Sequence, residues 1–329
     1  MSLQVLISIQ QRVAQWQIPE ASARALMARF PALTFTYACT DAERAAALAT
    51  AEVAYTWTLS AEELARAPTL RWVHTSAVAV ETLCLPELAA RGVRVSNTRG
   101  VQAVPIAEHV LAVVLVLAKQ LPFAIDSQRR GIWAQDAFTG ARLPWLLNGR
   151  TLGLIGLGTI GQALAARASA LGMSVLALRR QMDAPPVTGV SAIYGRDRLL
   201  EMLGKCDALV VAAPLTPHTN RLIDRTALGA LKPGAVVVNV GRSAIVDTDA
   251  LIDTLESGHL GGASLDVFPE EPLPPDHRLW TAPNVILTPH TSGFRQGHWD
   301  EVVHVFADNL HRYQAGEPLR FEVRAADGY

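Results

Sequence analysis

The sequence has few cysteines and no long apolar run. Only three cysteines occur among 329 residues, widely spaced at Cys39, Cys84 and Cys206, so neither a disulfide framework nor a zinc knuckle is predicted. The longest apolar run, residues 110–118, is far shorter than the roughly 20 residues that a membrane-spanning helix needs. No basic stretch precedes the first apolar residues, as it would in a secretory signal. We therefore expect a protein of the reducing cytoplasm with no membrane partner.

The chain also lacks an excess of charge of either sign. Lys and Arg total 29 against 30 Asp and Glu, which leaves a formal net charge of -1. Such a chain has no general field that attracts nucleic acid, so an anionic ligand must be held by local groups. The histidines form no metal-binding repeat, since His109 follows Glu108 alone and the later histidines lack a supporting carboxylate pattern. We expect neither a nucleic-acid partner nor a metal.

Apolar residues, in contrast, run along the whole chain and make up 50% of it. One hydrophobic core stops growing at roughly 250–300 residues, so two domains are expected. Short β-prone runs alternate with Ala-rich amphipathic stretches in two blocks, and this βαβ rhythm indicates an α/β fold with doubly wound sheets. The expected strands are residues 5–9, 34–37, 52–57, 71–75 and 93–96 in the first block, and 151–155, 174–178, 208–212, 236–240, 262–265 and 285–287 in the second.

Three further segments have distinct patterns. Residues 104–119 start beside the helix-favouring Pro105 and are apolar on nearly all sides, which predicts a buried helix between domains or subunits. Residues 121–150 are rich in Gly, Pro, Trp and Arg and indicate an arm or long connection. Two uses of this arm stay open: its Trp133 and Trp145 either reach a partner subunit or pack within one chain. Residues 298–315 are expected to be helical.

A glycine-rich turn opens the second block. The strand-like residues 151–155 run into Gly156-Leu-Gly158-Thr-Ile-Gly161, and a helix-compatible stretch follows. In a dinucleotide fold the first glycine permits the tight turn, the second lets backbone amides approach the pyrophosphate, and the third lets helix pack on strand. We therefore expect a dinucleotide at this turn, with Thr159 and Ile160 among its contacts. A tight turn without a ligand is the alternative reading of the glycines alone.

The strand that follows this turn ends on two cations. NAD-binding folds usually place Asp or Glu there to hold the ribose 2′-hydroxyl, but this sequence has Arg179 and Arg180. Two guanidiniums can hold a 2′-phosphate with charge-assisted hydrogen bonds, which favours NADP over NAD. The alternative is that both arginines are solvated at a strand end.

Three later passages contain residue types that are common in active sites. They are Asn239-Val-Gly-Arg242-Ser243, Leu265-Asp266-Val-Phe-Pro-Glu-Glu271-Pro and Thr288-Pro-His290-Thr-Ser-Gly293. Each follows a predicted strand, and the carboxyl ends of parallel strands share one edge of the sheet, so Arg, Glu and His can converge there. His290, Glu271 and Arg242 are residue types that can together transfer a proton and hold an anion.

The order and spacing of these motifs resemble the D-isomer-specific 2-hydroxyacid dehydrogenases, and most closely the NADP-dependent glyoxylate and hydroxypyruvate reductases. The similarity covers almost the entire chain and includes Pro214-Leu-Thr-Pro-His-Thr-Asn and Leu231-Lys-Pro-Gly-Ala. It implies two Rossmann-like domains, the nucleotide-binding one inserted into a flavodoxin-like substrate domain. Residues 1–99 and 291–329 would form the substrate domain, and residues 100–290 the dinucleotide-binding domain of a homodimer.

The resemblance also implies a role for each site residue. His290 would donate the proton, while Glu271 accepts a hydrogen bond from its other ring nitrogen and favours the imidazolium form. Arg242 would hold the substrate carboxylate with a planar fork of donors that lysine does not have. Asp266 would accept from the nicotinamide carboxamide. The resemblance further assigns to the cofactor site Pro214, Thr219, Val240 and Gly241.

A loop in the first block corresponds to the family's substrate loop. The backbone amides of Val78, Ala79 and Val80 would bind the substrate carboxylate. The family usually has Gly where Ala79 stands, so the backbone there must adopt a conformation that an L-residue tolerates. The alternative to a substrate loop is an ordinary buried turn between a strand and a helix, which would have the same apolar residues.

These observations favour an NADP-preferring reductase of a small 2-oxoacid. The small apolar residues of the substrate loop suit glyoxylate or hydroxypyruvate, which would be reduced to the D-2-hydroxyacid. One alternative is an NAD-dependent relative that acts on D-lactate, phosphoglycerate or a phosphonate. Another is a non-catalytic, dinucleotide-sensing protein like the corepressors that share the fold, which fold alone does not exclude.

Overall fold

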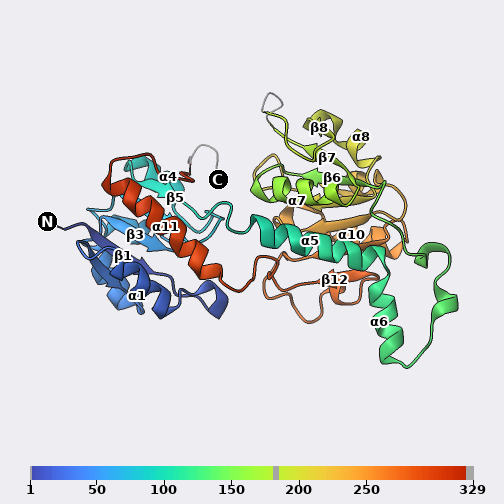
Figure 1. The fold of residues 1–329 in the computed structure, drawn as a ribbon, viewed down its shortest axis with the longest axis horizontal. Helices are drawn as coiled ribbons and strands as arrows, with labels where there is room; N and C mark the ends of the chain where they lie inside the picture. Colours follow the sequence, from blue (N-terminus) through green and yellow to red (C-terminus); the bar gives the residue numbers. More distant parts are fainter. Residues whose placement is uncertain (1, 181–184, 324–329) are drawn as a thin grey trace. The chain divides into compact units, whose positions relative to one another are not determined.

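The chain divides into two compact units. The computed structural model describes residues 2–180 and 185–323. Unit 1 runs to Val101 and resumes at Phe294, whereas unit 2 is the uninterrupted segment Gln102–Gly293 (Figure 1). The two ends of unit 2 are adjacent, because a Cβ placed on Gly293 would lie 2.8 Å from Gln102 Oε1. Unit 2 is therefore inserted into unit 1.

Unit 1 contains a five-stranded sheet with the order β2-β1-β3-β4-β5, and every pair is parallel. This is the strand order of flavodoxin-like sheets. Apolar clusters cover both faces of the sheet, and Phe306 stacks on Tyr55 with ring centroids 4.1 Å apart. The strands are β1 (Gln4–Ser8), β2 (Thr34–Tyr37), β3 (Val53–Thr56), β4 (Trp72–Thr75) and β5 (Arg94–Ser96). The helices are α1 (Glu20–Ala28), α2 (Asp41–Leu48), α3 (Ala61–Ala65), α4 (Leu85–Ala90) and α11 (His298–Gln314).

Unit 2 contains a seven-stranded parallel sheet with the order β12-β11-β10-β9-β6-β7-β8. The chain builds outward from β6 to β8, then crosses back and builds outward from β9 to β12. The order thus reverses between β6 and β9, and ligands of open α/β sheets bind at such a switch point, beyond the carboxyl ends of the strands. The strands are β6 (Thr151–Ile155), β7 (Ser174–Leu178), β8 (Ala192–Tyr194), β9 (Ala208–Val211), β10 (Val236–Asn239), β11 (Gly262–Leu265) and β12 (Val285–Leu287).

Helices cover both faces of this sheet. On one face, α5 (Ala103–Ala118) packs with α7 (Thr159–Ala170) in one apolar cluster (Figure 1). The other cluster is built by α8 (Leu199–Leu203), α9 (Arg225–Gly229) and α10 (Thr248–Glu256). Strands covered on both sides need continuous apolar runs rather than alternation, and the sequences ALVV of β9 and VVVN of β10 are such runs. The predicted α/β class with two doubly wound parallel sheets is confirmed.

Two elements depart from the prediction. The edge strand β8 was not expected, and residues 121–150, expected to be irregular, begin with the nine-residue helix α6 (Leu121–Arg129). Helix α5 spans Ala103–Ala118, one residue earlier at each end than the expected range, and Pro105 lies in its first turn. Within the described residues no single helix has both the length and the apolar character of a membrane span, although α5 and α6, bent by 67° at their junction, meet these criteria as a pair.

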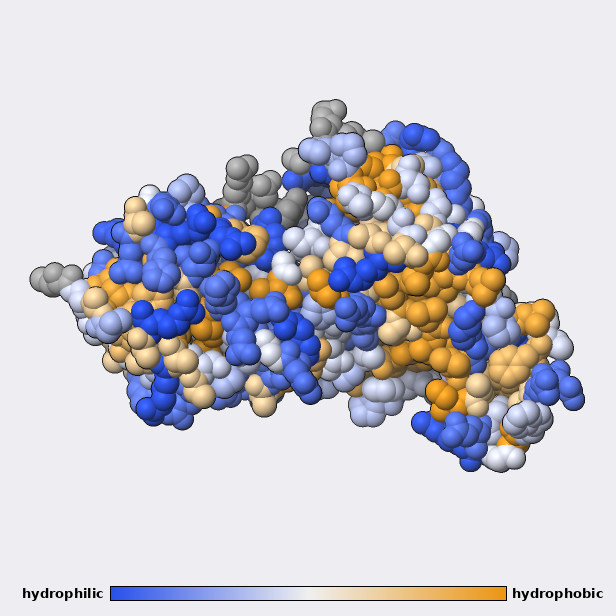
Figure 2. All heavy atoms as spheres, in the orientation of Figure 1, coloured by the Kyte–Doolittle hydropathy of each residue, from blue (hydrophilic) through white to orange (hydrophobic). Residues whose placement is uncertain are grey.

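Apolar side chains stay exposed on α5 and on the segment that follows it (Figure 2). Trp133 is 90% exposed and Leu146 66% exposed. Exposed apolar side chains close together are typical of a surface that another protein covers. The others on this surface are Val104, Leu115, Leu121, Ile125, Ile132 and Leu143.

Candidate active site

The glycine-rich turn joins β6 to α7 at the switch point of the unit 2 sheet. Gly156 has a φ of +102°, and a Cβ there would lie 2.9 Å from the backbone of Ala213. A Cβ on Gly161 would lie 2.3 Å from the Gly156 carbonyl oxygen. Both glycines are therefore required by the packing of the turn itself.

Gly158 has a different environment. It is the N-cap residue of the twelve-residue helix α7, and a Cβ on it would have no atom within 4 Å. Packing does not explain this glycine, but a ligand that approaches the backbone closely would. The first amides of a helix, here those of Thr159 and Ile160, have no intrahelical acceptor and favour an anion. The turn therefore fits the pyrophosphate of a dinucleotide.

The two cations lie where β7 ends. The Arg179 backbone amide donates to the Tyr194 carbonyl oxygen at 3.1 Å, which continues the pairing of β7 with β8 beyond the strand. The Arg179 guanidinium is half-buried and donates to the Pro185 carbonyl oxygen at 3.2 Å, whereas Arg180 is exposed. No carboxylate takes the place of these two residues at the end of β7.

A tight turn follows β10 and presents Arg242. The buried Asn239 side chain spans this turn: its Oδ1 accepts from the Gly241 amide at 3.0 Å, and its Nδ2 donates to the Arg242 carbonyl oxygen at 3.1 Å. Gly241 packs against the end of β9, where a Cβ would lie 2.8 Å from the Ala213 carbonyl oxygen. The Arg242 side chain is half-buried, and its Nη1 donates to the Gly241 carbonyl oxygen at 2.8 Å. The backbone of Arg242 is thus held from both sides.

Glu271 and His290 are in direct contact. His290 Nδ1 lies 2.8 Å from Glu271 Oε2, and the other carboxylate oxygen, Oε1, accepts from the Phe268 amide at 3.0 Å. Both carboxylate oxygens are therefore engaged, which fixes the orientation of Glu271. The His290 side chain remains 48% exposed, and its backbone has a φ of +55°. The ring is thus oriented through Nδ1 while part of it stays open to a ligand.

Asp266 joins the end of β11 to the segment that carries His290. Its carboxylate is buried and accepts three hydrogen bonds. Oδ1 accepts from the Thr288 hydroxyl at 2.6 Å and from the Thr291 amide at 2.8 Å, and Oδ2 accepts from the Ser292 amide at 3.0 Å. The Thr288 hydroxyl also lies 3.5 Å from His109 Nε2 on α5, where burial lowers the pKa of His109. Asp266 therefore determines the backbone path on both sides of His290.

These residues lie at one edge of one sheet. Strands β10, β11 and β12 are consecutive neighbours and parallel, so the residues after their carboxyl ends lie close together. Arg242 follows β10, Asp266 and Glu271 follow β11, and His290 follows β12. Nearby, Pro214 and Thr219 form a closed loop after β9, where the Thr219 hydroxyl donates to the Pro214 carbonyl oxygen at 2.7 Å. The predicted catalytic and cofactor residues of unit 2 thus share this edge or the turn beside it.

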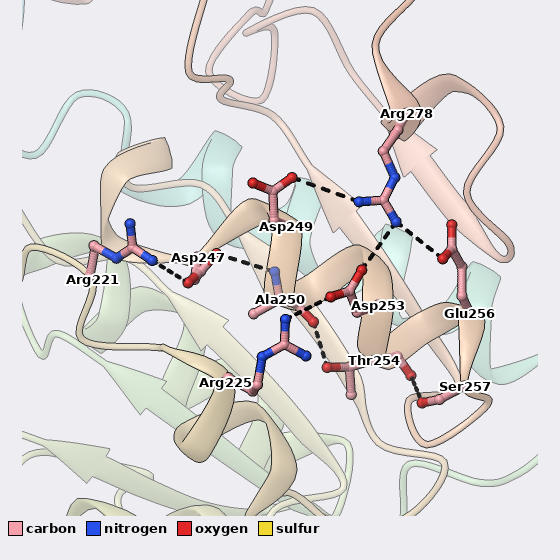
Figure 3. A network of polar contacts seen from close by, with 10 residues as sticks. All are labelled: Arg221, Arg225, Asp247, Asp249, Ala250, Asp253, Thr254, Glu256, Ser257 and Arg278. Atoms are coloured by element: carbon pink, nitrogen blue, oxygen red, sulfur yellow. Dashed lines mark hydrogen bonds and ion pairs between the residues drawn. The ribbon is translucent and has the colours of Figure 1, made fainter.

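A surface ion-pair network connects the loop that contains Glu271 to a neighbouring helix. Arg278, in the short 3-10 helix Arg278–Trp280 of this loop, donates to Asp253 and to Glu256 of α10, each at 3.1 Å (Figure 3). Asp253 also accepts from Arg225 at 2.6 Å. Single exposed ion pairs contribute little, but shared charges of this kind hold a loop in one position. The network ties residues after β11 to the neighbouring helix.

The predicted substrate loop lies in unit 1, after β4. Asn97 Nδ2 donates to the Val78 carbonyl oxygen at 2.7 Å and the Thr98 hydroxyl to the Ser76 carbonyl oxygen at 2.9 Å. Ala79 is not among the residues with positive φ, so its backbone adopts a conformation open to an L-residue. The amides of residues 78–80 donate no hydrogen bond within the described part of unit 1. The loop is held through its carbonyl groups; Val78 and Ala79 are half-buried and Val80 is buried.

Comparisons with known proteins assign the chain to a family. Residues 111–292 match the sequence model of the D-isomer specific 2-hydroxyacid dehydrogenase NAD binding domain, and this range contains the glycine-rich turn, Arg242, Asp266, Glu271 and His290. The chain belongs to this family of dehydrogenases. Among the described residues, no three His, Cys, Asp or Glu side chains are grouped as a metal site would need.

Individual relatives carry different names. A glyoxylate reductase of Thermococcus gammatolerans is 35% identical over 262 residues, which cover 79% of this chain and 78% of that protein. A D-3-phosphoglycerate dehydrogenase of Mycobacterium leprae is 36% identical over 79% of this chain. The match spans only 48% of that longer relative, about half its length. A D-isomer specific 2-hydroxyacid dehydrogenase of Xanthobacter autotrophicus, crystallised with NADPH and MES, is 28% identical with a TM-score of 0.83 over the full length of both chains.

Three residues of the site were not singled out from the sequence. They are Asn239, which spans the Arg242 turn, Phe268, whose amide orients Glu271, and Thr288, which lies between Asp266 and His109. Asn239 had a usable signal, since a lone polar residue ending the buried run VVVN is placed to bond the following turn. The amide of Phe268 has no side-chain signal at all.

Proposed function

We propose that this dehydrogenase reduces a small 2-oxoacid of the glyoxylate or hydroxypyruvate type to the D-2-hydroxyacid, with NADPH as the preferred reductant. The contact of His290 Nδ1 with Glu271 Oε2 at 2.8 Å carries the proposal. It leaves Nε2 as the ring nitrogen that holds the transferable proton, and a carboxylate on Nδ1 stabilises the positive charge of an imidazolium. When bound, the reduced nicotinamide supplies the hydride for the carbonyl carbon. His290 then donates a proton to the carbonyl oxygen, which completes the alcohol.

Arg242 is proposed to hold the substrate carboxylate and to polarise the carbonyl group. Its backbone is fixed by Asn239, so the guanidinium is presented from a rigid turn. Residues 1–99 and 291–329 would form the substrate-binding domain and residues 100–290 the dinucleotide-binding domain. The amides of Val78, Ala79 and Val80 are proposed to bind the substrate carboxylate, which is supported by their lack of acceptors in the described part of unit 1.

The preference for NADPH rests on the end of β7. Arg179 and Arg180 stand where an acidic residue would hold the 2′-hydroxyl of NAD, and a 2′-phosphate is attracted to guanidinium groups. Gly158 leaves space for the pyrophosphate at the start of α7. Asp266 would accept from the nicotinamide carboxamide with the remaining capacity of Oδ2, which accepts a single bond within unit 2. The Xanthobacter relative crystallised with NADPH supports the same preference.

The exposed apolar surface of α5 and residues 121–146 is proposed to bind a second copy of the chain (Figure 2). This proposal is supported by the number of exposed apolar side chains on α5 and on the segment that follows it, since large exposed apolar patches mark interaction sites. Light scattering coupled to size-exclusion chromatography should give the mass of a homodimer. A monomeric mass at micromolar concentration would contradict this part of the proposal.

A panel of 2-oxoacids assayed with NADPH and with NADH tests the proposed activity. We expect glyoxylate or hydroxypyruvate with NADPH to give the highest kcat/KM. His290→Ala should lower kcat by about 10²–10⁴-fold, the usual contribution of a positioned acid, while NADPH binding measured by fluorescence persists. His304→Ala on the exposed side of α11 is the matched control and should retain activity. Binding of NADPH without reduction of any 2-oxoacid would favour a dinucleotide-sensing protein, and higher efficiency with NADH would refute the cofactor preference.

A further inference from the structure

The edge strand β8 brings another cation next to the end of β7. Strands β7 and β8 are parallel, with Leu178 opposite Tyr194, and the Arg179 amide extends this pairing by one hydrogen bond. Neighbouring strands lie about 4.8 Å apart, so residues that follow their carboxyl ends are close in space. Arg180 is the second residue after β7, and Arg196 is the second residue after β8. The two guanidiniums therefore start from the same edge of the sheet.

Arg196 differs from the neighbouring arginine on the same turn. Arg198 forms two hydrogen bonds with the Glu201 carboxylate, at 2.8 and 2.9 Å, and lies over the Tyr194 ring. In residues 2–180 and 185–323, the Arg196 guanidinium makes no ion pair and no hydrogen bond, and its side chain is exposed. Arg198 stabilises the turn, whereas Arg196 is free to contact a ligand.

We infer that Arg196 is a further specificity residue, which contacts the phosphate monoester on the adenosine ribose of NADPH. This inference rests on the proposed preference for NADPH. A ribose 2′-phosphate carries nearly two negative charges at neutral pH and three acceptor oxygens, more than one guanidinium can satisfy. Arg179 already donates one of its N–H groups to the Pro185 carbonyl oxygen, which leaves part of its fork for a ligand. An additional guanidinium from β8 supplies the donors that remain.

One acidic residue lies on the same turn. The Asp197 carboxylate folds back over Gly195, so that a Cβ there would lie 2.5 Å from Asp197 Oδ1. Among the described residues that follow β7 and the turn after β8, residues 179, 180 and 195–197, the charged side chains are Arg179, Arg180 and Arg196 against the carboxylate of Asp197, so positive charge predominates there. A positive edge attracts a phosphate and has little effect on a neutral ribose hydroxyl.

The test compares binding of 2′,5′-ADP and of 5′-AMP to the full chain by titration calorimetry. These two probes differ in the 2′-phosphate and require no turnover. We expect the unaltered protein to bind 2′,5′-ADP more tightly, and Arg196→Ala to weaken 2′,5′-ADP by about fivefold, the effect of one exposed charged contact, with 5′-AMP unchanged. Arg196→Lys should recover part of the loss. Arg198→Ala, the matched control, should leave the ratio of the two affinities unchanged.

The outcomes separate the inference from the proposal beneath it. If the unaltered protein discriminates between the probes but Arg196→Ala behaves like Arg198→Ala, Arg196 is not a specificity residue and the NADPH preference stands on Arg179 and Arg180. Equal weakening of both probes by Arg196→Ala would also refute the inference, because it would indicate a general effect on the adenosine site. If the unaltered protein binds both probes equally, the NADPH preference itself fails and the inference fails with it.

Discussion

Asp266 Oδ1 accepts a hydrogen bond at 2.8 Å from the amide of Thr291, the residue directly after His290. Together with the bonds from Thr288 and Ser292, this contact makes one buried carboxylate the anchor for the segment that positions the proposed acid. His290 itself has a left-handed backbone, with a φ of +55°, which a non-glycine residue adopts only where its neighbours hold it. The Asp266 carboxylate therefore holds the backbone on both sides of His290.

Asp266→Asn tests this anchoring. The amide NH₂ replaces one acceptor with a donor that faces N–H or O–H groups, so at least one of the three bonds is lost. We expect the free energy of unfolding of unit 2 to fall by about 1–3 kcal/mol, and hydrogen exchange of the amides at residues 291 and 292 to accelerate. Asp276→Asn, on the exposed part of the same loop, is the control and should change neither. Unaltered exchange at 291 and 292 would contradict the anchoring role.

Arg242→Lys should be nearly as damaging as removal of the side chain. Lysine keeps the charge but not the planar fork that meets a carboxylate through two parallel bonds. We expect KM for the 2-oxoacid to rise and kcat to fall, for a combined loss of about 10²-fold in kcat/KM. Arg225→Lys, in the surface network of Figure 3, is the matched control with near-normal kinetics. A 242 variant with intact kcat/KM would show that only positive charge is needed.

The glycines of the turn should separate folding from cofactor binding. Gly161→Ala places a Cβ 2.3 Å from the Gly156 carbonyl oxygen, so we expect unit 2 to lose about 1–3 kcal/mol of stability through overpacking. Gly158→Ala meets no atom within 4 Å, and its φ of -78° suits an L-residue, so stability should hardly change. Its Cβ would, however, occupy the space proposed for the pyrophosphate, and NADPH affinity should fall by about tenfold. Thermal unfolding and fluorescence titration distinguish these results, and normal affinity in the 158 variant would place the pyrophosphate elsewhere.

The stability of unit 1 should depend on pH through His74. This side chain is fully buried on β4, where Nδ1 contacts the Ser96 hydroxyl at 2.7 Å, and burial lowers the pKa of His74 to about 3. In the unfolded chain the same group titrates near 6.5, so below that pH the unfolded state binds a proton that the folded state does not. Above pH 6.5, His74 therefore causes no loss of the free energy of unfolding of unit 1. As the pH falls from 6.5 towards 3, this free energy decreases by up to about 1.4 kcal/mol for each pH unit.

Hydrogen exchange of the β4 amides between pH 7 and pH 4.5, corrected for intrinsic rates, measures this dependence. His74→Asn keeps a polar group near Ser96 without a titrating ring, so its opening free energy should vary less with pH than that of the unaltered protein. His304→Asn, on the exposed face of α11, should show the unaltered profile. Parallel profiles for the 74 variant and the unaltered protein would exclude His74 as the source.

Much of the fold was predictable because the central strands are buried on both faces. A strand such as β10 appears in the sequence as an uninterrupted apolar run, and four of the expected second-block strands match the observed bounds residue for residue. Strand β8, with only Ala192, Ile193 and Tyr194 at the sheet edge, carries too short an apolar signal to be found this way. Helix α6 was missed because Pro122 and the polar residues after it are typical of loops as well as of a first helical turn.

The reactive side chains of the site could be predicted from the sequence, but the hydrogen bonds that position them could not. The contact of Glu271 with His290 was expected from the resemblance, and the two side chains lie within hydrogen-bond distance. The three hydrogen bonds to Asp266 join residues that are far apart in the sequence. Arg180 and Arg196 follow paired strands. No local sequence pattern predicts either arrangement. Residues that position the site are therefore the ones that the sequence alone leaves unmarked.

The chain enters and leaves unit 2 at neighbouring points, Gln102 and Gly293. A segment whose two ends meet can be excised or exchanged as a cassette, because its removal leaves a gap in the host that a short linker closes. The glycine-rich turn, Arg242, Asp266, Glu271 and His290 all lie inside this cassette. With the proposed roles, replacing unit 1 alone would change which acid is recognised and keep the proposed catalytic residues, which makes this architecture a starting point for redesigning substrate choice.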